Sequence, residues 1–395
     1  MLSTPVRGQN LEAAPIYRPA NVVVLSLTTA LIVVALYTWY PVLPVILQHR
    51  GASSFAVSTV YTLIALAAAL LQLQGGRLAD RFGRRLLLAL PTFIAAVLYG
   101  VVWWSSDWQV LAIALIIMNA SGALQSPSFT ALTAESVPPS HRAQAFSTFQ
   151  FATGLATLAG PAIGAILLPT LGVRPLMAMT AIASLAAAVV RITMLKDTKR
   201  GRPSQPFHIR HAFSGRLRHL TMASTAFLAV AALTVNGPFI ALYAHNEGHL
   251  TSSIVNLLFS VGWLPAVVLS FWLGRRIEAF GSARALGIGV AGHLGILGVW
   301  LLLRGAFPMM IALAASFLFY QLAVIAWGTL RMEQVGQENA GAALGAIGTV
   351  AGIVSAGGPI LGGALGSFLG PYAAFLLAGL MGAWTLLALR RLPEV

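Results

Sequence analysis

Long apolar runs alternate with short polar stretches from one end of this chain to the other. A helix of about 20 apolar residues spans the roughly 30 Å hydrocarbon core of a bilayer, and only helices or closed barrels satisfy their backbone groups there. The pattern therefore predicts an all-α integral membrane protein with twelve membrane-spanning helices. They are expected over residues 21–47, 55–75, 86–104, 108–132, 144–168, 175–195, 220–244, 254–274, 284–303, 308–330, 342–366 and 372–389.

The polar stretch between the second and third apolar runs returns in the second half of the chain. It reads GRLADRFGRR at residues 76–85 and GRRIEAFG at residues 274–281, an offset of 198 residues (274 − 76). The same offset places Gly160-Pro161 on Gly358-Pro359. One offset held over such a distance indicates a tandem duplication with both halves in the same orientation. We therefore divide the chain into a tail (1–20), a six-helix bundle (21–195), a basic linker (196–219) and a second six-helix bundle (220–392).

Basic residues gather on one side of the predicted membrane. With the N-terminus inside, the outer loops hold Arg50, Arg174 and Arg304, and the inner segments hold the other 21 of the 24 Lys and Arg residues. This bias places both termini in the cytoplasm, and the chain is expected as a multi-pass protein of the cell's inner, cytoplasmic membrane. The net charge of +14 then reflects topology, with contact between the linker and anionic lipid as the alternative, and no nucleic-acid partner is expected.

Composition narrows the functional class. Charged residues make up only 9% of the chain, against about 25% in a soluble domain, so the lipid bilayer is the expected surrounding. The chain has no cysteine, which excludes thiol catalysis, disulfides and thiolate metal sites. The sequence shows no phosphate-binding loop, no nucleophile–base spacing and no metal-ligand cluster. We therefore expect neither an enzyme nor a bound cofactor or metal.

The polar stretch resembles the G-x-x-x-D-R-x-G-R-R motif between helices 2 and 3 of the major facilitator superfamily. The matching positions are Gly76, Asp80, Arg81, Gly83, Arg84 and Arg85. The degenerate copy around Glu278 stands where that family has one, between helices 8 and 9. Gly160-Pro161 resembles part of the antiporter motif in the family's drug/proton antiporter branch. The resemblance implies two pseudo-symmetric six-helix bundles and transport by alternating access.

The resemblance also implies an inner gate. Asp80 would contact the start of helix 11, where a carboxylate is favoured by the helix dipole, and Glu278 would do the same at the start of helix 5, near Arg142. Glu135 and Arg142 would complete a charge cluster in the first half. The alternative is that the arginines of the motif only set topology.

Two Gly-Pro pairs are expected in the middle of helices. In Gly160-Pro161 and Gly358-Pro359 the proline removes a backbone hydrogen bond and bends its helix, while the glycine allows close packing. The bends would seal or shape a central cavity. Ordinary packing of small residues is the alternative.

The resemblance implies a cavity lined by helices 1, 4, 7 and 10. Aromatic and amide side chains on these and neighbouring helices are the expected lining, since amides within a membrane need partners. They are Tyr37, Tyr40, Asn119, Gln125, Gln150, Asn236, Phe239, Tyr243, Tyr320, Gln321 and Trp327. With no carboxylate expected at mid-membrane, the predicted pocket has no fixed charge and favours neutral or amphipathic molecules over strong anions.

Because no carboxylate is expected at mid-membrane, proton coupling through a buried acid is disfavoured. His293, within a predicted helix, and the pair His245 and Glu247, at the outer end of another, are the candidate proton sites. For His293 a packed structural role is the alternative.

We predict a monomeric secondary active transporter that exports small amphipathic or drug-like compounds, with coupling to protons left open. A carrier or uniporter for a neutral solute such as a sugar is one alternative. A membrane receptor or scaffold that has kept the fold without transport is another.

Overall fold

The structure is a computed structural model that describes residues 17–198, 215–335 and 340–392. The described residues form helices, with no strand among them. The helices of the first half are α1 (Ala20–Tyr37), η1 (Tyr40–Val42), α2 (Leu43–His49), α3 (Ser54–Phe82), α4 (Arg84–Trp104), α5 (Trp108–Glu135), η2 (Pro139–His141), α6 (Arg142–Leu171) and α7 (Val173–Met194). Those of the second half are α8 (Gly215–Leu233), α9 (Phe239–Asn246), α10 (Ser252–Val268), α11 (Ser270–Phe280), α12 (Ser282–Trp300), α13 (Ala306–Gln334), α14 (Ala340–Ser355), α15 (Gly358–Leu369) and α16 (Ala373–Leu389).

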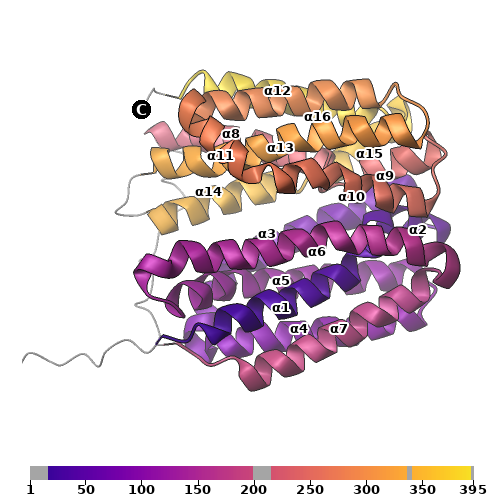
Figure 1. The fold of residues 1–395 in the computed structure, drawn as a ribbon. Helices are drawn as coiled ribbons and strands as arrows, with labels where there is room; N and C mark the ends of the chain where they lie inside the picture. The colour runs from indigo at the N-terminus through magenta and orange to yellow at the C-terminus, as the bar shows by residue number, and fades with distance from the viewer. Residues whose placement is uncertain (1–16, 199–214, 336–339, 393–395) are drawn as a thin grey trace, which may run out of the picture.

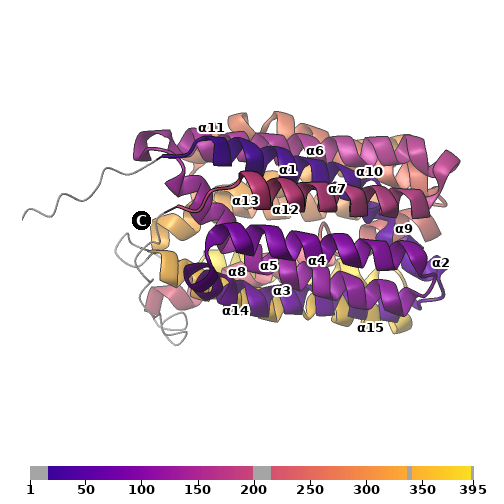
Figure 2. The same cartoon turned by 90° about the horizontal axis from the view of Figure 1, so that it is seen from below.

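The helices gather into two groups that follow the two halves of the sequence (Figure 1). In the first group α1 packs against α6 and α7, α3 against α5, and α4 against α5 and α7. In the second, α13 packs against α10 and α12, and α8 packs against α14 and α16. The long helices run side by side along one direction in both views (Figures 1 and 2).

The 198-residue offset of the sequence recurs where the two groups meet. Helix α3 packs against α14 and α15, and α10, which begins 198 residues after α3, packs against α6. Each seam contains a hydrogen bond made by a hydroxyl side chain at an equivalent position. Thr62 Oγ1 accepts from Ile360 N over 2.9 Å in one seam, and Ser260 Oγ donates to the Leu158 carbonyl over 2.8 Å in the other. Thr62 and Ser260 are themselves 198 residues apart. The groups therefore meet along two related seams.

Nine helices among the described residues are long and apolar enough to cross a membrane. Three further apolar helices, over Leu217–Leu233, Ser252–Val268 and Ala373–Leu389, are shorter. The predicted all-helical membrane class agrees with this finding. The predicted number of twelve crossings stays a prediction.

Four segments expected as single helices are interrupted, which corrects the prediction. The predicted helix over 21–47 divides into α1, η1 and α2, and the one over 220–244 divides into α8 and α9. The segments over 254–274 and 342–366 divide at Leu269 and between Ser355 and Gly358. Proline lies at or near each interruption, where its missing N–H and its ring oppose a continuous helix.

The pair Gly358-Pro359 is not in the middle of a helix. Pro359 lies in the first turn of α15, where no N–H is required of it, whereas Pro161 lies within the continuous helix α6. The two pairs are therefore structurally different despite their matching sequence positions. At Gly160 an added Cβ would lie 2.6 Å from Tyr37 Cβ, so this glycine allows α6 to approach α1 closely.

The charged stretch over residues 76–85 is mostly helix rather than a loop. Helix α3 continues to Phe82 and α4 begins at Arg84, with Gly83 alone between them at a φ of +88°. Gly281 occupies the equivalent joint between α11 and α12 at +81°. Residues other than glycine rarely adopt this left-handed conformation. The sharp turn explains why the glycine recurs in both halves.

Candidate functional site: a cavity between the two halves

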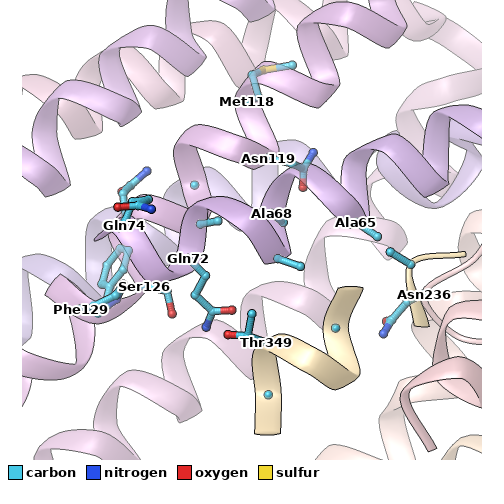
Figure 3. Close-up of a pocket in the computed structure, with 18 of the residues that line it drawn as sticks. Ala65, Ala68, Gln72, Gln74, Met118, Asn119, Ser126, Phe129, Asn236 and Thr349 are labelled. Carbon is cyan, nitrogen blue, oxygen red and sulfur yellow. The ribbon is translucent and has the colours of Figure 1, made fainter. Parts of the chain in front are cut away.

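A cavity of about 1780 Å³ lies between the two groups of helices. The first half lines it from α1, α3, α4, α5 and α7, and the second from α8, α13, α14, α15 and the turn before α9. Figure 3 shows part of this lining, with Gln72 of α3, Asn119 of α5 and Thr349 of α14. Its volume exceeds the 300–1,000 Å³ typical of small-molecule pockets, so a drug-sized molecule fits.

The two halves touch at one end of this cavity. Helix α2 contacts α9 there, Asn246 Nδ2 donates to Gln48 Oε1 over 3.3 Å, and the rings of His49 and His245 lie 5.5 Å apart, edge to face. Gln48 and Asn246 are 198 residues apart. We call these four residues the α2–α9 contact.

Tyrosines line the cavity near this contact. The rings of Tyr37 and Tyr40 lie 5.9 Å apart, and Tyr61 and Tyr99 complete the aromatic wall on the first half. Asn236, in the turn between α8 and α9, faces the cavity from the second half. Aromatic surface with a few polar groups suits the apolar part of an organic molecule.

Six of the eleven residues predicted to line the cavity do so: Tyr37, Tyr40, Asn119, Gln125, Asn236 and Trp327. The other five lie outside its lining. Gln150 is exposed on α6 and Gln321 is half-buried on α13. Tyr243 donates to the Leu301 carbonyl, Tyr320 stacks on Phe227 at 6.0 Å, and Phe239 packs beside Gly362. Helical rotation and the break before α9 turn these side chains elsewhere.

The expectation of a pocket without fixed charge was wrong. Three arginines line the cavity, Arg84, Arg191 and Arg331, and the described lining residues include no Asp or Glu. Of the three, Arg84 forms an ion pair with Glu135. The charges of the other two have no carboxylate partner within the described part of the chain.

Arg191 is buried in a polar network at the end of α7. Its side chain is only 2% exposed, although it lies only five residues before the basic linker over 196–219. Its donors reach only neutral groups, namely Thr28 Oγ1 at 3.0 Å, Thr29 Oγ1 at 2.8 Å, Thr92 Oγ1 at 2.6 Å and Gln125 Oε1 at 3.1 Å. A signal was present in the sequence, since apolar residues flank Arg191 on both sides.

Arg331 lies one helical turn after Trp327 on α13. Its guanidinium carbon is 3.4 Å from the centre of the Trp327 ring, and Trp327 Nε1 in turn donates to Ser224 Oγ over 3.0 Å. The buried Nε of Arg331 has no hydrogen-bond partner among the described residues. Positions i and i+4 share a helix face, so a sequence that places Trp327 in the cavity lining also places Arg331 there.

Among the charged residues of the predicted gate, the structure describes the side chains of Arg84, Glu135 and Arg142. Arg84 pairs with Glu135, and Thr198 also donates to Glu135, so the predicted charge cluster of Glu135 and Arg142 stays a prediction. Arg142 Nε donates instead to the Ala134 carbonyl over 3.1 Å.

The other members of the motif lie close to the turn at Gly83. The backbone N–H of Arg85 donates to Asp197 Oδ1 over 2.8 Å, and Arg81 is exposed beside Phe82. Gly76 lies within α3. The side chains of Asp80 and Glu278 lie outside the described residues, so their predicted contacts stay predictions.

The candidate proton sites lie away from the cavity lining. His293 is buried, with Nε2 3.1 Å from Thr234 Oγ1 and Nδ1 2.8 Å from Ser316 Oγ. His245 Nδ1 lies 2.8 Å from the Leu250 carbonyl, and its ring packs on His49 rather than pairing with Glu247. His293 thus has the partners expected of a packed histidine.

Comparison with known proteins supports a transporter fold. Residues 25–221 match the family model described as Major Facilitator Superfamily. The chain is 27% identical over 265 residues to a multi-drug resistance efflux pump PmrA homolog of Lactococcus lactis subsp. lactis (strain IL1403), covering 63% of this chain and 64% of that one. It is 26% identical over 264 residues to multidrug resistance protein MdtG of Serratia proteamaculans (strain 568), covering 62% of each.

These matches span less than two thirds of the relatives' length. A solved structure resembles almost the whole chain. The crystal structure of the nucleoside transporter NupG superposes with a TM-score of 0.75 at 13% identity, covering 94% of this chain and 99% of that one. At this identity the likeness concerns the fold alone.

Proposed function

The chain belongs to the major facilitator superfamily, and we propose that it is a secondary transporter that exports small amphipathic or drug-like compounds by alternating access. One relative is named a multi-drug resistance efflux pump and the other a multidrug resistance protein, and these names support the direction of transport and the substrate class. The described residues include no cluster of metal-ligating side chains, and the proposed activity requires none.

One observation carries this proposal: a large cavity lies between two halves that touch at one end. The α2–α9 contact joins the halves at that end of the molecule, and Asn256 of α10 adds a hydrogen bond to the Thr38 carbonyl of the first half. Alternating access requires two states in which a central site opens to opposite sides. A cavity whose halves are held together at one end by such contacts fits one of those states.

We further propose twelve crossings, with the three shorter apolar helices completing the nine longer ones. The bundles are then residues 21–195 and 220–392, joined by the linker over 196–219. The end of the molecule where α1 begins and α16 ends (Figure 1) would face the cytoplasm, because the predicted inner segments hold 21 of the 24 Lys and Arg residues. The chain would act as a monomer in the cell's inner membrane, with the α2–α9 contact outside and the cavity open to the cytoplasm.

The gate belongs to the same proposal. When the cytoplasmic mouth closes, Asp80 would meet the start of α14 and Glu278 the start of α6, as the motif implies. The turn at Gly83 and the pairs Arg84–Glu135 and Arg85–Asp197 support it by anchoring the motif to its own half, so that the motif moves as part of a rigid bundle.

The experiment compares dye export by cells that express the wild-type chain and the variant Asp80→Asn. The wild-type chain should lower the accumulation of a lipophilic dye, and the variant should abolish this effect at equal expression, because the amide removes the charge that the gate requires. Normal export by Asp80→Asn would refute the gate. The wild-type measurement tests the alternatives, since a receptor or scaffold and a sugar carrier would each leave dye levels unchanged.

A further inference from the structure

Two arginines of the cavity lining have no carboxylate partner among the described residues, and they indicate which charge the substrate carries. Arg191 and Arg331 approach the cavity from opposite halves, and Arg84 is already neutralised by Glu135. The described lining residues contribute no negative charge. An inference on substrate charge rests on the proposed function, because it assumes that this cavity is the binding site.

Arg331 has the geometry of a direct ligand for an anionic group. Its guanidinium carbon lies 3.4 Å from the centre of the Trp327 ring, so the indole covers this group on one side. Its Nε is buried without a partner in the described part of the chain, and a buried donor without an acceptor destabilises the state that contains it. A carboxylate accepts two parallel hydrogen bonds from the planar guanidinium fork, and so would satisfy that donor.

Arg191 contributes positive charge without being free to reorient. Its hydroxyl and amide partners hold the guanidinium from α1, α4 and α5, and Phe129 lies 5.1 Å from it. None of these groups carries a negative charge. In a poorly screened interior one unit charge affects another over several ångströms, so Arg191 favours anions in the adjoining space and disfavours cations.

We propose that the cavity binds amphipathic molecules that carry a carboxylate or a similar single anionic group. Arg331 is the direct ligand of that group, and Arg191 is a positioning charge. The apolar part of the molecule packs against the apolar residues that line the cavity. Organic cations are disfavoured by the same two arginines.

The test measures binding of two matched fluorescent probes to the purified full chain. One is a naphthalene carrying a carboxylate and the other is the corresponding carboxamide, so that they differ only in the anionic group. A charge-assisted hydrogen bond of about 1.5–3 kcal/mol corresponds to roughly a tenfold or greater preference. The wild-type chain should bind the carboxylate at least about tenfold more tightly than the carboxamide.

Arg331→Gln should remove this preference, and Arg331→Lys should keep part of it, because lysine retains the charge without the fork. Arg276→Gln is the matched control. Arg276 also stacks on a tryptophan four residues earlier, Trp272, at 4.8 Å, but it does not line the cavity. The control should keep the full preference.

Equal binding of the two probes by the wild-type chain would overturn the inference, as would an unchanged preference in Arg331→Gln. If Arg331→Gln does not fold, the other two variants decide the question. A full carboxylate preference in Arg331→Lys, together with loss of that preference in Arg276→Gln, would also overturn the inference. Failure of the proposed function gives a different result. Carboxylate binding that depends on Arg331, without export from cells, would refute transport and leave the anion site in place.

Discussion

At the residue scale, the inward position of Arg191 adds a positive charge to the cavity lining. Arg191 occupies a position where an apolar run meets a basic linker, so its side chain could equally point to solvent or inward. Threonines on two other helices and an amide on a third decide between these outcomes, since together they replace water around the guanidinium. That choice depends on contacts between segments more than 60 residues apart in the sequence.

Arg191→Gln should destabilise the protein. The shorter amide cannot reach the partners on all three helices, and buried hydroxyls lose charge-assisted bonds, so the free energy of unfolding should fall by about 2–4 kcal/mol. Denaturant titration of the purified chain in detergent measures this change. Arg390 is an exposed arginine that follows α16. Arg390→Gln is therefore the control, and it should change the free energy of unfolding by less than about 0.5 kcal/mol. Equal stability of the two variants would contradict the structural role of Arg191.

At the element scale, sequence patterns predicted most helices but not their interruptions. Apolar length predicted the helix pairs around Gly83 and Gly281, and Ser53 and Thr251 accept hydrogen bonds at the starts of α3 and α10. Hydropathy alone does not show where α8 gives way to α9, because the residues on both sides of the break are apolar. The break moves Phe239 and Tyr243 off the cavity face, which is why those two predictions failed while Asn236 lines the cavity.

Close approach of helices depends on glycines that hydropathy does not reveal. At Gly164 of α6 an added Cβ would lie 2.0 Å from the Thr38 carbonyl oxygen and 2.4 Å from Asn256 Nδ2. Asn256 donates to that same carbonyl over 2.6 Å, so the contact joins the two halves. Backbone and a buried amide leave little room to adjust.

Gly164→Ala should therefore lower the unfolding midpoint, with a cost of about 1–3 kcal/mol from overpacking. Gly298→Ala is the control, because nothing lies within 4 Å of an added Cβ there and alanine is the better helix former by up to about 1 kcal/mol. The control should be neutral or stabilising. A Gly164→Ala protein as stable as the wild-type chain would show that α6 and α1 can separate at no cost.

At the scale of the whole molecule, duplication relates the contacts that hold the halves together. The 198-residue offset connects the two seams, and it also connects Gln48 with Asn246, which bond to each other. Equivalent residues meet in this way only near a pseudo-two-fold axis. The repeat was readable from the sequence, whereas the choice of which equivalent residues meet depends on how the bundles pack.

If the protein transports by alternating access as proposed, the α2–α9 contact must open in each cycle, and a reversible cross-link across this contact tests that movement. The chain has no native cysteine, so Gln48→Cys and Asn246→Cys place the only two thiols across the contact. A short, reducible bifunctional thiol reagent would join them, and dye export would be measured before cross-linking, after it and after reduction, with each single-cysteine variant as a control. Cross-linking should stop export, reduction should restore it, and the single-cysteine variants should be unaffected. Export at the wild-type rate from quantitatively cross-linked protein would show that the contact does not need to open.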